Sequence, residues 1–203
     1  MKKIGFLVLF CSLANYSFSS DSASESHGWN VGAGIGAANI SVKSVGQPGF
    51  KSTSKSAAVV TAFGGYKYTD WFGLEIDVSQ SDSITDESTG LDASVWGISF
   101  SPKFSLQFND HLSSYLKVGA QYLAYDQKVD SLFGDKIKWA GIDPFLGVGL
   151  QYQFDFGLLT KIDYRYLNMR LERKSGAVFS SVLFDESIDF GYRTLTLTAG
   201  YQF

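Results

Sequence analysis

The last ten residues of the chain, TLTLTAGYQF (residues 194–203), alternate strictly between two kinds of side chain. Every second position is apolar, in the series Leu195, Leu197, Ala199, Tyr201 and Phe203. The positions between them carry threonine, glycine or glutamine. Successive side chains of a β-strand point to opposite faces, so this period of two predicts a strand that separates an apolar environment from a polar one.

The same alternation recurs at five places upstream: residues 72–79, 96–106, 116–122, 146–154 and 161–166. Two further stretches, at about residues 29–42 and 57–68, are rich in glycine and alanine. They complete a set of eight predicted strands of about ten residues each. We find no helical periodicity and no low-complexity linker, so the sequence predicts one all-β domain.

The segments between the predicted strands are alternately short and long. The short turns are residues 69–71, 109–111 and 155–156, and the long connections are residues 43–56, 81–92, 126–138 and 172–191. Transmembrane barrels have short periplasmic turns and long extracellular loops, and their closure leaves no unpaired sheet edge in lipid. The sequence therefore predicts an eight-stranded antiparallel up-and-down transmembrane β-barrel with its N- and C-termini in the periplasm.

Aromatic residues gather near both ends of the predicted strands, as they do at the two interfaces of a bilayer. We expect the membrane-interface aromatics to be Tyr68, Trp71, Phe72, Trp96, Phe154, Tyr166, Tyr201 and Phe203. Tyr125, Trp139 and Tyr192 are assigned to the belt near the long connections. The alternative is a soluble ligand-binding barrel with its apolar face inside. Such a barrel has no reason to carry two aromatic belts, so the apolar face is expected to meet lipid.

The opposite face of these strands carries charged residues, which are then expected inside the barrel. They are Lys67, Glu75, Asp77, Lys103, Lys117, Lys161, Asp163 and Arg165. The interior of an eight-stranded barrel is just wide enough for its own side chains, and buried charges must be paired. We expect an ion-pair network that plugs the barrel. The alternative is a narrow gated pore that opens when ion-pair partners are exchanged.

Composition and the N-terminus exclude several other classes of protein. Charged residues make up 18% and aromatic residues 16% of the chain, which excludes a disordered protein, and the net charge of −3 argues against a nucleic-acid partner. Residues 1–19 have the charge, apolar run and small residues of a secretory signal peptide, with cleavage after Ala14 as the alternative. The barrel domain then comprises residues 20–203, which lack cysteine because Cys11 is removed.

Candidate catalytic groups are scarce. His27 precedes the first strand and His111 lies in a short turn, away from the outer rim where enzymes of this architecture act on lipids. We therefore predict no catalytic site, no metal site and no cofactor. Four carboxylates in one long connection are expected to be solvated or to bind a divalent cation loosely: Asp82, Asp86, Glu87 and Asp92.

Two long connections are candidates for binding. Lys43, Lys51 and Lys55 make the first one basic, at the level of lipopolysaccharide phosphates. The connection at residues 172–191 contains an apolar stretch, residues 177–184. This stretch either packs on neighbouring loops or forms a surface for a ligand.

Four motifs resemble those of the OmpA-like and opacity-type family of small outer-membrane β-barrels. They are YTDWFGLE (68–75), DPFLGVGLQY (143–152), IDYRY (162–166) and the terminal YQF (201–203). The resemblance implies location in the outer membrane of a Gram-negative bacterium and recognition of Phe203 by the barrel-assembly machinery. The peptidoglycan-binding domain of full-length OmpA proteins is not expected.

The resemblance also implies a function. We expect a non-enzymatic protein that contacts outer-membrane lipid and lipopolysaccharide, supports membrane integrity and presents surface loops. The alternatives are an adhesin or host-factor-binding protein that uses the loop at residues 172–191, and a narrow gated ion channel.

Overall fold

The structure, a computed structural model, describes residues 27–44, 53–82, 84–86, 91–129, 136–175 and 187–203. The predicted signal peptide, residue Lys51 and the apolar stretch at 177–184 lie outside these residues. In the described part of the chain no helix is long and apolar enough to cross a membrane.

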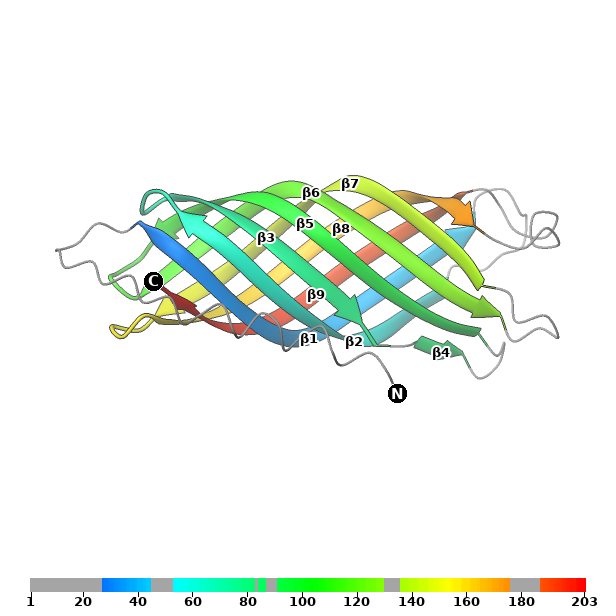
Figure 1. The fold of residues 1–203 in the computed structure, drawn as a ribbon, viewed down its shortest axis with the longest axis horizontal. Coiled ribbons are helices and arrows are strands. Elements are labelled where there is room, and N and C mark those ends of the chain that lie inside the picture. Colours follow the sequence, from blue (N-terminus) through cyan, green and yellow to red (C-terminus); the bar gives the residue numbers. More distant parts are fainter. Residues whose placement is uncertain (1–26, 45–52, 83, 87–90, 130–135, 176–186) are drawn as a thin grey trace.

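Eight long strands form a closed antiparallel barrel (Figure 1). They are β1 (Gly28–Ser44), β2 (Thr53–Lys67), β3 (Phe72–Ser81), β5 (Leu91–Gln107), β6 (Leu112–Val129), β7 (Lys136–Gln153), β8 (Leu158–Ser175) and β9 (Ser187–Gln202). The short strand β4 (Ile84–Asp86) pairs with the end of β5. The ring closes because β3 pairs with β5 and β1 pairs with β9. The predicted eight-stranded up-and-down barrel is confirmed.

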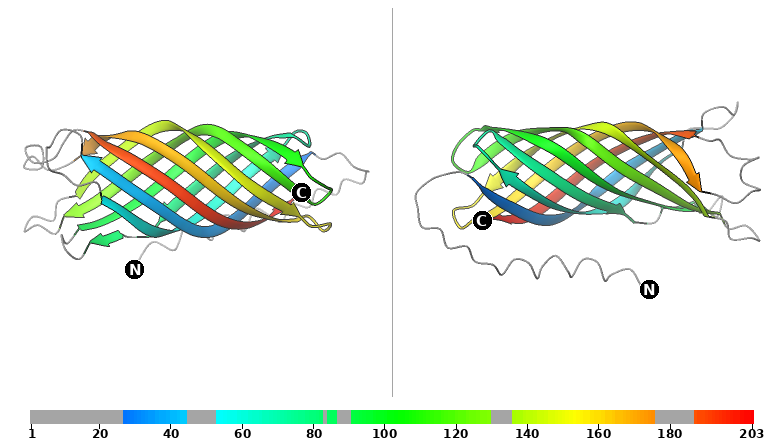
Figure 2. Two further views of the ribbon diagram at one scale, coloured as in Figure 1. Left: turned by 180° about the vertical axis from the view of Figure 1, so that it is seen from behind. Right: turned by 45° about the horizontal axis from the view of Figure 1, so that its top comes forward.

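The two ends of the barrel differ (Figures 1 and 2). The turns at residues 68–71, 108–111 and 154–157 lie at one end, together with the start of β1 and the end of β9. We call this the short-turn end, and the opposite end the long-connection end. Gly157 has a φ of 86°, a left-handed conformation that glycine adopts without steric cost, and this allows the tight turn before β8.

The strands are longer than the sequence suggested. Only β3 has the expected 10 residues, whereas the other long strands have 15 to 18. The additional residues lie mainly at the long-connection end, in segments that the sequence analysis assigned to loops. Alternation of apolar and polar side chains locates only the part of a strand that lies between lipid and a polar lumen. Strand pairing continues past that part.

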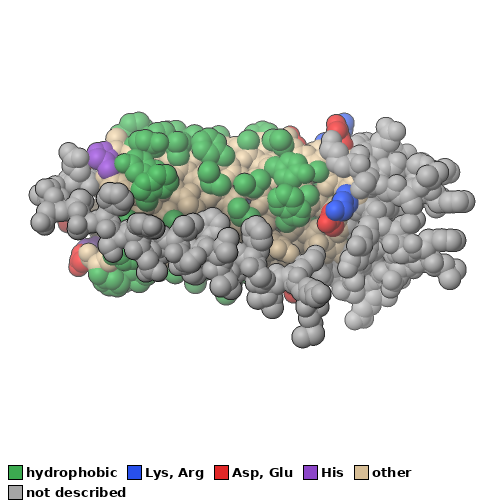
Figure 3. Space-filling view, in the orientation of Figure 1, with side chains coloured by type: hydrophobic (Ala, Val, Ile, Leu, Met, Phe, Trp, Pro, Cys, Tyr) green, Lys and Arg blue, Asp and Glu red, His purple; other side chains and the backbone are tan. Residues whose placement is uncertain are grey.

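The reason can be seen along β8. Near Tyr166 its inward face changes from charged to apolar side chains, and its outward face changes from apolar to polar ones. On the short-turn side of Tyr166 the inward side chains are Lys161, Asp163 and Arg165, and beyond it they are Leu167, Met169 and Leu171. The outward side chains change in the opposite sense, from Ile162 and Tyr164 to Asn168, Arg170 and Glu172. β9 changes in the same way near Arg193. Figure 3 shows apolar side chains over the visible wall, with charged ones toward the long-connection end.

The long-connection half of the barrel therefore contains an apolar core. It is formed by Ala38, Ile40, Val59, Ala93, Val95, Leu123, Tyr125, Trp139, Phe145, Leu167, Met169, Leu171, Ile188, Phe190 and Tyr192. The assignment of Tyr125, Trp139 and Tyr192 to an outer aromatic belt is wrong, because these side chains are buried inside the barrel. They fill the interior of the half of the barrel whose outward side chains are polar, as apolar side chains do in a water-soluble core.

Pairing between β7 and β8 is interrupted in this half. Ala140 pairs with Glu172 and Leu146 with Tyr166 in one register, but the residues between them, 141–145 and 167–171, do not form ladder pairs. Pro144 lies in this segment and has no N–H to donate. Phe145 and Leu167 belong to the apolar core, so the wall here is held by packing as well as by strand pairing.

Candidate functional site

The most highly charged region inside the barrel lies on the short-turn side of the apolar core. Six charged side chains from three strands meet there: Glu75 and Asp77 of β3, Lys117 of β6, and Lys161, Asp163 and Arg165 of β8. Each side chain is at most 8% exposed. The period of two directs them inward, because their neighbours in sequence face outward. We refer to these six residues as the charge cluster.

Lys117 is the centre of the charge cluster. Its Nζ donates to Glu75 Oε1 at 2.7 Å and lies 2.8 Å from Asp163 Oδ2. Asp77 Oδ1 is 3.8 Å away. One ammonium group therefore links carboxylates from β3 and β8.

Two further ion pairs complete the cluster. Lys161 Nζ donates to Glu75 Oε2 at 2.6 Å, and Arg165 Nη2 lies 3.1 Å from Asp77 Oδ2. Three cations thus face three carboxylates, and the cluster is formally neutral. Buried charges require this balance, because an unpaired ion in a poorly solvated interior is strongly unfavourable.

Neutral side chains complete the hydrogen bonding of the cluster. Tyr115 OH donates to Asp163 Oδ2 at 3.0 Å, and Ser99 Oγ donates to Asp77 Oδ2 at 3.1 Å. Arg165 Nη1 in turn donates to Ser99 Oγ at 3.0 Å. Lys161 lies over the ring of Phe63 and Arg165 over that of Phe145, with separations from the ring centres of 3.3 and 4.5 Å. These four neutral residues are not among the predicted site residues, although the alternation of their strands places them on the inward face.

The charge cluster leaves little free space. The cavity beside it measures about 20 Å³, which is room for one or two water molecules. The cluster and the apolar core beyond it therefore fill most of this part of the lumen with side chains.

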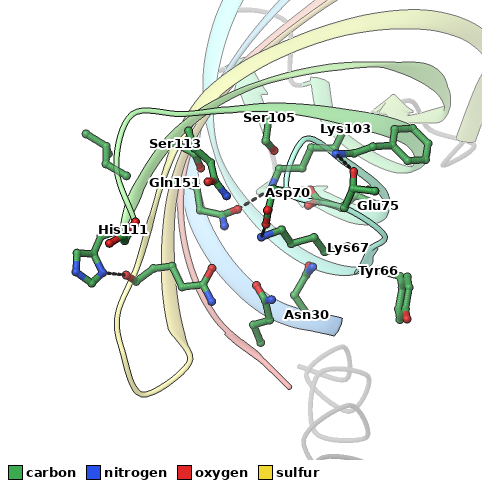
Figure 4. A pocket seen from close by; sticks show the side chains of 18 of the residues that line it. Asn30, Tyr66, Lys67, Asp70, Glu75, Lys103, Ser105, His111, Ser113 and Gln151 are labelled. Atoms are coloured by element: carbon green, nitrogen blue, oxygen red, sulfur yellow. Dashed lines mark hydrogen bonds and ion pairs between the residues drawn. The ribbon is translucent and has the colours of Figure 1, made fainter. Parts of the chain in front are cut away.

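The other two predicted lumenal cations, Lys67 and Lys103, lie nearer the mouth at the short-turn end (Figure 4). Lys67 Nζ is 3.1 Å from Asp70 Oδ1 of the adjacent turn. Lys103 Nζ donates to Gln151 Oε1 at 2.5 Å and lies 4.5 Å from the ring centre of Tyr115. The structure therefore separates the eight predicted charges into a six-residue cluster and two residues at the mouth.

The expected membrane-interface aromatics lie on the outside of the barrel. At the short-turn end, Trp71, Phe72 and Phe104 are in mutual ring contact, and Tyr201 contacts Phe203. Tyr68 contacts Phe72, and Phe154 contacts Tyr152. Nearer the long-connection end, Trp96 packs on Tyr122, and the guanidinium of Arg193 lies 5.4 Å from the ring centre of Tyr166.

Both histidines lie near the short-turn end. His27 precedes β1, and His111 Nδ1 lies 3.1 Å from the carbonyl oxygen of Gln153. Within the described ranges, no group of three or more His, Cys, Asp or Glu side chains is placed to hold a metal ion. Glu87 of the predicted acidic connection lies outside those ranges, as does the apolar stretch at 177–184.

Solved structures confirm the likeness of the fold. Ail from Yersinia pestis, solved with the heparin analogue sucrose octasulfate, is 19% identical with a TM-score of 0.53, and the match covers 86% of this chain and 99% of Ail. OprG from Pseudomonas aeruginosa is 15% identical with a TM-score of 0.61, over 89% of this chain and 98% of OprG. Neisserial surface protein A is 15% identical with a TM-score of 0.57, over 88% of this chain and 100% of that protein.

Sequence comparison is more restrictive. No curated protein sequence matches the chain. The family profile described as "Outer membrane protein beta-barrel domain" matches residues 5–203. This match spans nearly the whole chain, and the chain therefore belongs to the family of outer-membrane protein β-barrel domains.

Proposed function

We propose that this protein is a non-enzymatic barrel that supports outer-membrane integrity and presents its long connections at the cell surface. In this arrangement the short-turn end and both termini are in the periplasm. The observation that carries the proposal is the exchange of polar and apolar faces near Tyr166 and Arg193. It marks where the wall leaves the hydrocarbon and continues as a rigid stalk with its own apolar core.

The stalk raises the long connections well above the bilayer. β8 continues from Tyr166 to Ser175, and nine residues of a tilted strand rise roughly 20 Å. Its outward surface is polar, and the exposed Arg170 is 3.4 Å from Asp189 of β9. A rigid, water-compatible support suits a protein whose loops must project through a sugar layer.

Arg193 supports lipopolysaccharide as the lipid partner. It is exposed beside Tyr166, at the level where lipid-facing side chains end. Its register partner on β1 is the exposed Asn39, which accepts a hydrogen bond from Ser54. A guanidinium flanked by hydrogen-bonding groups at this level suits the phosphates of the outer leaflet.

Phe203 supports recognition by the barrel-assembly machinery. Its side chain is exposed, and its N–H donates to the carbonyl oxygen of Trp29 at 2.8 Å. The terminal aromatic therefore lies on the outside of the seam where the last strand meets the first. Replacement of Phe203 by Ala is expected to lower the amount of folded barrel in the outer membrane, and unchanged assembly kinetics would contradict this role.

The integrity role is tested in isogenic cells that lack the protein, contain it, or contain a variant with residues 177–184 replaced by a Gly-Ser spacer of equal length. Loss of the protein should increase sensitivity to detergents and large antibiotics, and the spacer variant should restore resistance. Equal sensitivity of all three strains would contradict the proposal.

A second candidate function is binding of a host factor, favoured by the stalk that holds the loops away from the membrane. The likeness to Ail suggests a sulfated sugar as the probe. Cells with the intact loop should adhere to heparin-coated surfaces, and the spacer variant should not. Equal adhesion of the two would remove this candidate without affecting the integrity role.

A further inference from the structure

The mouth at the short-turn end is a polar pocket that the charge cluster does not fill (Figure 4). Inward-facing side chains from β1, β2, β5, β6 and β7 line it, among them Asn30, Lys67, Lys103, Ser105, Ser113 and Gln151. Three carboxylates line it as well: Asp70 is paired with Lys67, Glu75 is paired with Lys117 and Lys161, and Asp110 is exposed in the turn at the rim. Its free volume is about 40 Å³, which is room for about three water molecules. That space is of the size of a carboxylate or phosphate group.

Lys103 has an unusual position in this pocket. It is the register partner of Lys117 on the neighbouring strand, so two ammonium groups enter the same lumen side by side. Like charges opposite each other across a strand pair are destabilising. The carboxylates Glu75 and Asp163 are within 2.8 Å of Lys117, which leaves Lys103 with neutral partners. These are Gln151 Oε1 and the ring of Tyr115.

The balance of charge in the lumen is therefore incomplete. The charge cluster is neutral, and Lys67 is paired with Asp70 at 3.1 Å. Among the described residues, no carboxylate forms an ion pair with Lys103. Lys103 is therefore the lysine of this pocket without an ion-pair partner in the described part of the chain, and an anion bound against it would supply the missing negative charge.

We infer that this pocket binds a small oxyanion, a carboxylate or a phosphate, against Lys103 Nζ. The hydroxyls of Ser105 and Ser113 and the side-chain amide of Gln151 are directional donors, which suit the lone pairs of oxygen better than a spherical halide. Asn30 supplies a complementary acceptor. Its side chain is 9% exposed and its Oδ1 has no hydrogen-bond partner. A ligand that carries its own O–H, such as hydrogen phosphate, offers a donor to Asn30 Oδ1 as well as acceptors to Lys103 Nζ.

The site opens toward one side only. The charge cluster and the apolar core separate it from the long-connection end. With the short-turn end in the periplasm, the ligand is a periplasmic solute. Binding at the mouth does not depend on the loops. A failure of anion binding would therefore leave loop presentation and adhesion untouched, and a failure of those roles would leave anion binding untouched.

The test uses the folded barrel in detergent micelles, with NMR detection of the side-chain amides of Asn30 and Gln151. Sodium phosphate, sodium acetate and sodium chloride are titrated at constant pH and ionic strength. Phosphate should shift both amides saturably, and chloride should not. Saturation by acetate as well would identify any carboxylate as a ligand, whereas saturation by phosphate alone would restrict the site to phosphates.

Two matched variants locate the site. Lys103→Gln should weaken phosphate binding at least ~10-fold, because a charge-assisted hydrogen bond is lost. Lys138→Gln, which removes an exposed lysine paired with Asp126 at the long-connection end, should bind phosphate as the native protein does. Both variants must retain heat-modifiable mobility on gels, which reports a closed barrel. The inference is overturned if no oxyanion saturates the shifts, or if Lys103→Gln binds with unchanged affinity.

Discussion

Glu75 and Lys161 meet across the full width of the barrel, with Lys161 Nζ 2.6 Å from Glu75 Oε2. Their strands, β3 and β8, are separated by three strands in either direction around the ring. Both side chains are 2% exposed. This ion pair, which we call the strut, therefore links opposite walls of the barrel. Its loss is expected to destabilise the whole barrel.

Removal of one partner of this strut is expected to lower the free energy of unfolding strongly. Glu75→Gln leaves Lys161 without a carboxylate ion-pair partner among the described residues and should lower the free energy of unfolding by about 3–5 kcal/mol. Urea unfolding in micelles measures the change. The control is Lys67→Met, which breaks a half-exposed pair with Asp70 and should cost less than about 1 kcal/mol.

The double variant Glu75→Leu with Lys161→Met provides the complementary test. It removes one charge of each sign, and Lys117 keeps Asp163 at 2.8 Å. Replacement of a buried ion pair by apolar side chains is often neutral, so most of the lost stability should return. If the double variant is as unstable as Glu75→Gln, the strut acts through shape rather than charge.

The apolar core should contribute to stability although it lies outside the hydrocarbon. Phe190 is 0% exposed. Phe190→Ala should lower the free energy of unfolding by about 3–5 kcal/mol, because it removes buried apolar surface and leaves a cavity. The matched control is Leu195→Ala on the same strand, whose side chain is 55% exposed toward lipid. Leu195→Ala should lower the free energy of unfolding by a clearly smaller amount. Equal costs would contradict the assignment of a packed core above the bilayer.

The position of the bilayer can be tested with arginine substitutions. Leu197→Arg places a charge on the lipid-facing wall, where it should cost about 2–4 kcal/mol. Asn168→Arg places the same charge on the polar wall beyond Tyr166 and should change stability by less than about 0.5 kcal/mol. Folding into liposomes followed by urea unfolding gives both values. A large cost at Asn168 would move the membrane boundary toward the long connections.

Ion conduction is expected to be absent. The charge cluster fills most of its part of the lumen, and Leu123 and Phe190 of the apolar core are each 0% exposed beyond it. Neither the native protein nor Lys117→Ala should therefore conduct ions across planar bilayers, because the apolar core still excludes water from the lumen. Steps in conductance from the native barrel, altered by this substitution, would establish the gated channel instead.

The sequence alone was sufficient for the architecture. Alternation along residues 194–203 and its upstream equivalents gives the number of strands, and the spacing of turns gives their order. The same parity also assigns the charged side chains to the lumen. Parity extended along the same strand also indicates an inward Tyr125, because Tyr125 is an even number of residues from Lys117, whereas nearness to a long connection alone predicted the outer belt.

Only the tertiary structure decided which lumenal residues meet. Parity tells which face a side chain is on, but its height in the barrel depends on the tilt and stagger of the strands, which arise when the ring closes. For this reason Glu75 pairs with Lys161 from the opposite wall, whereas Lys103, in register with Lys117, is left at the mouth. The change of pattern near Tyr166 is visible in the sequence, but only the folded barrel shows that the charged residues before it and the apolar residues after it face inward alike, because β8 stays paired with β9 in one register through this point.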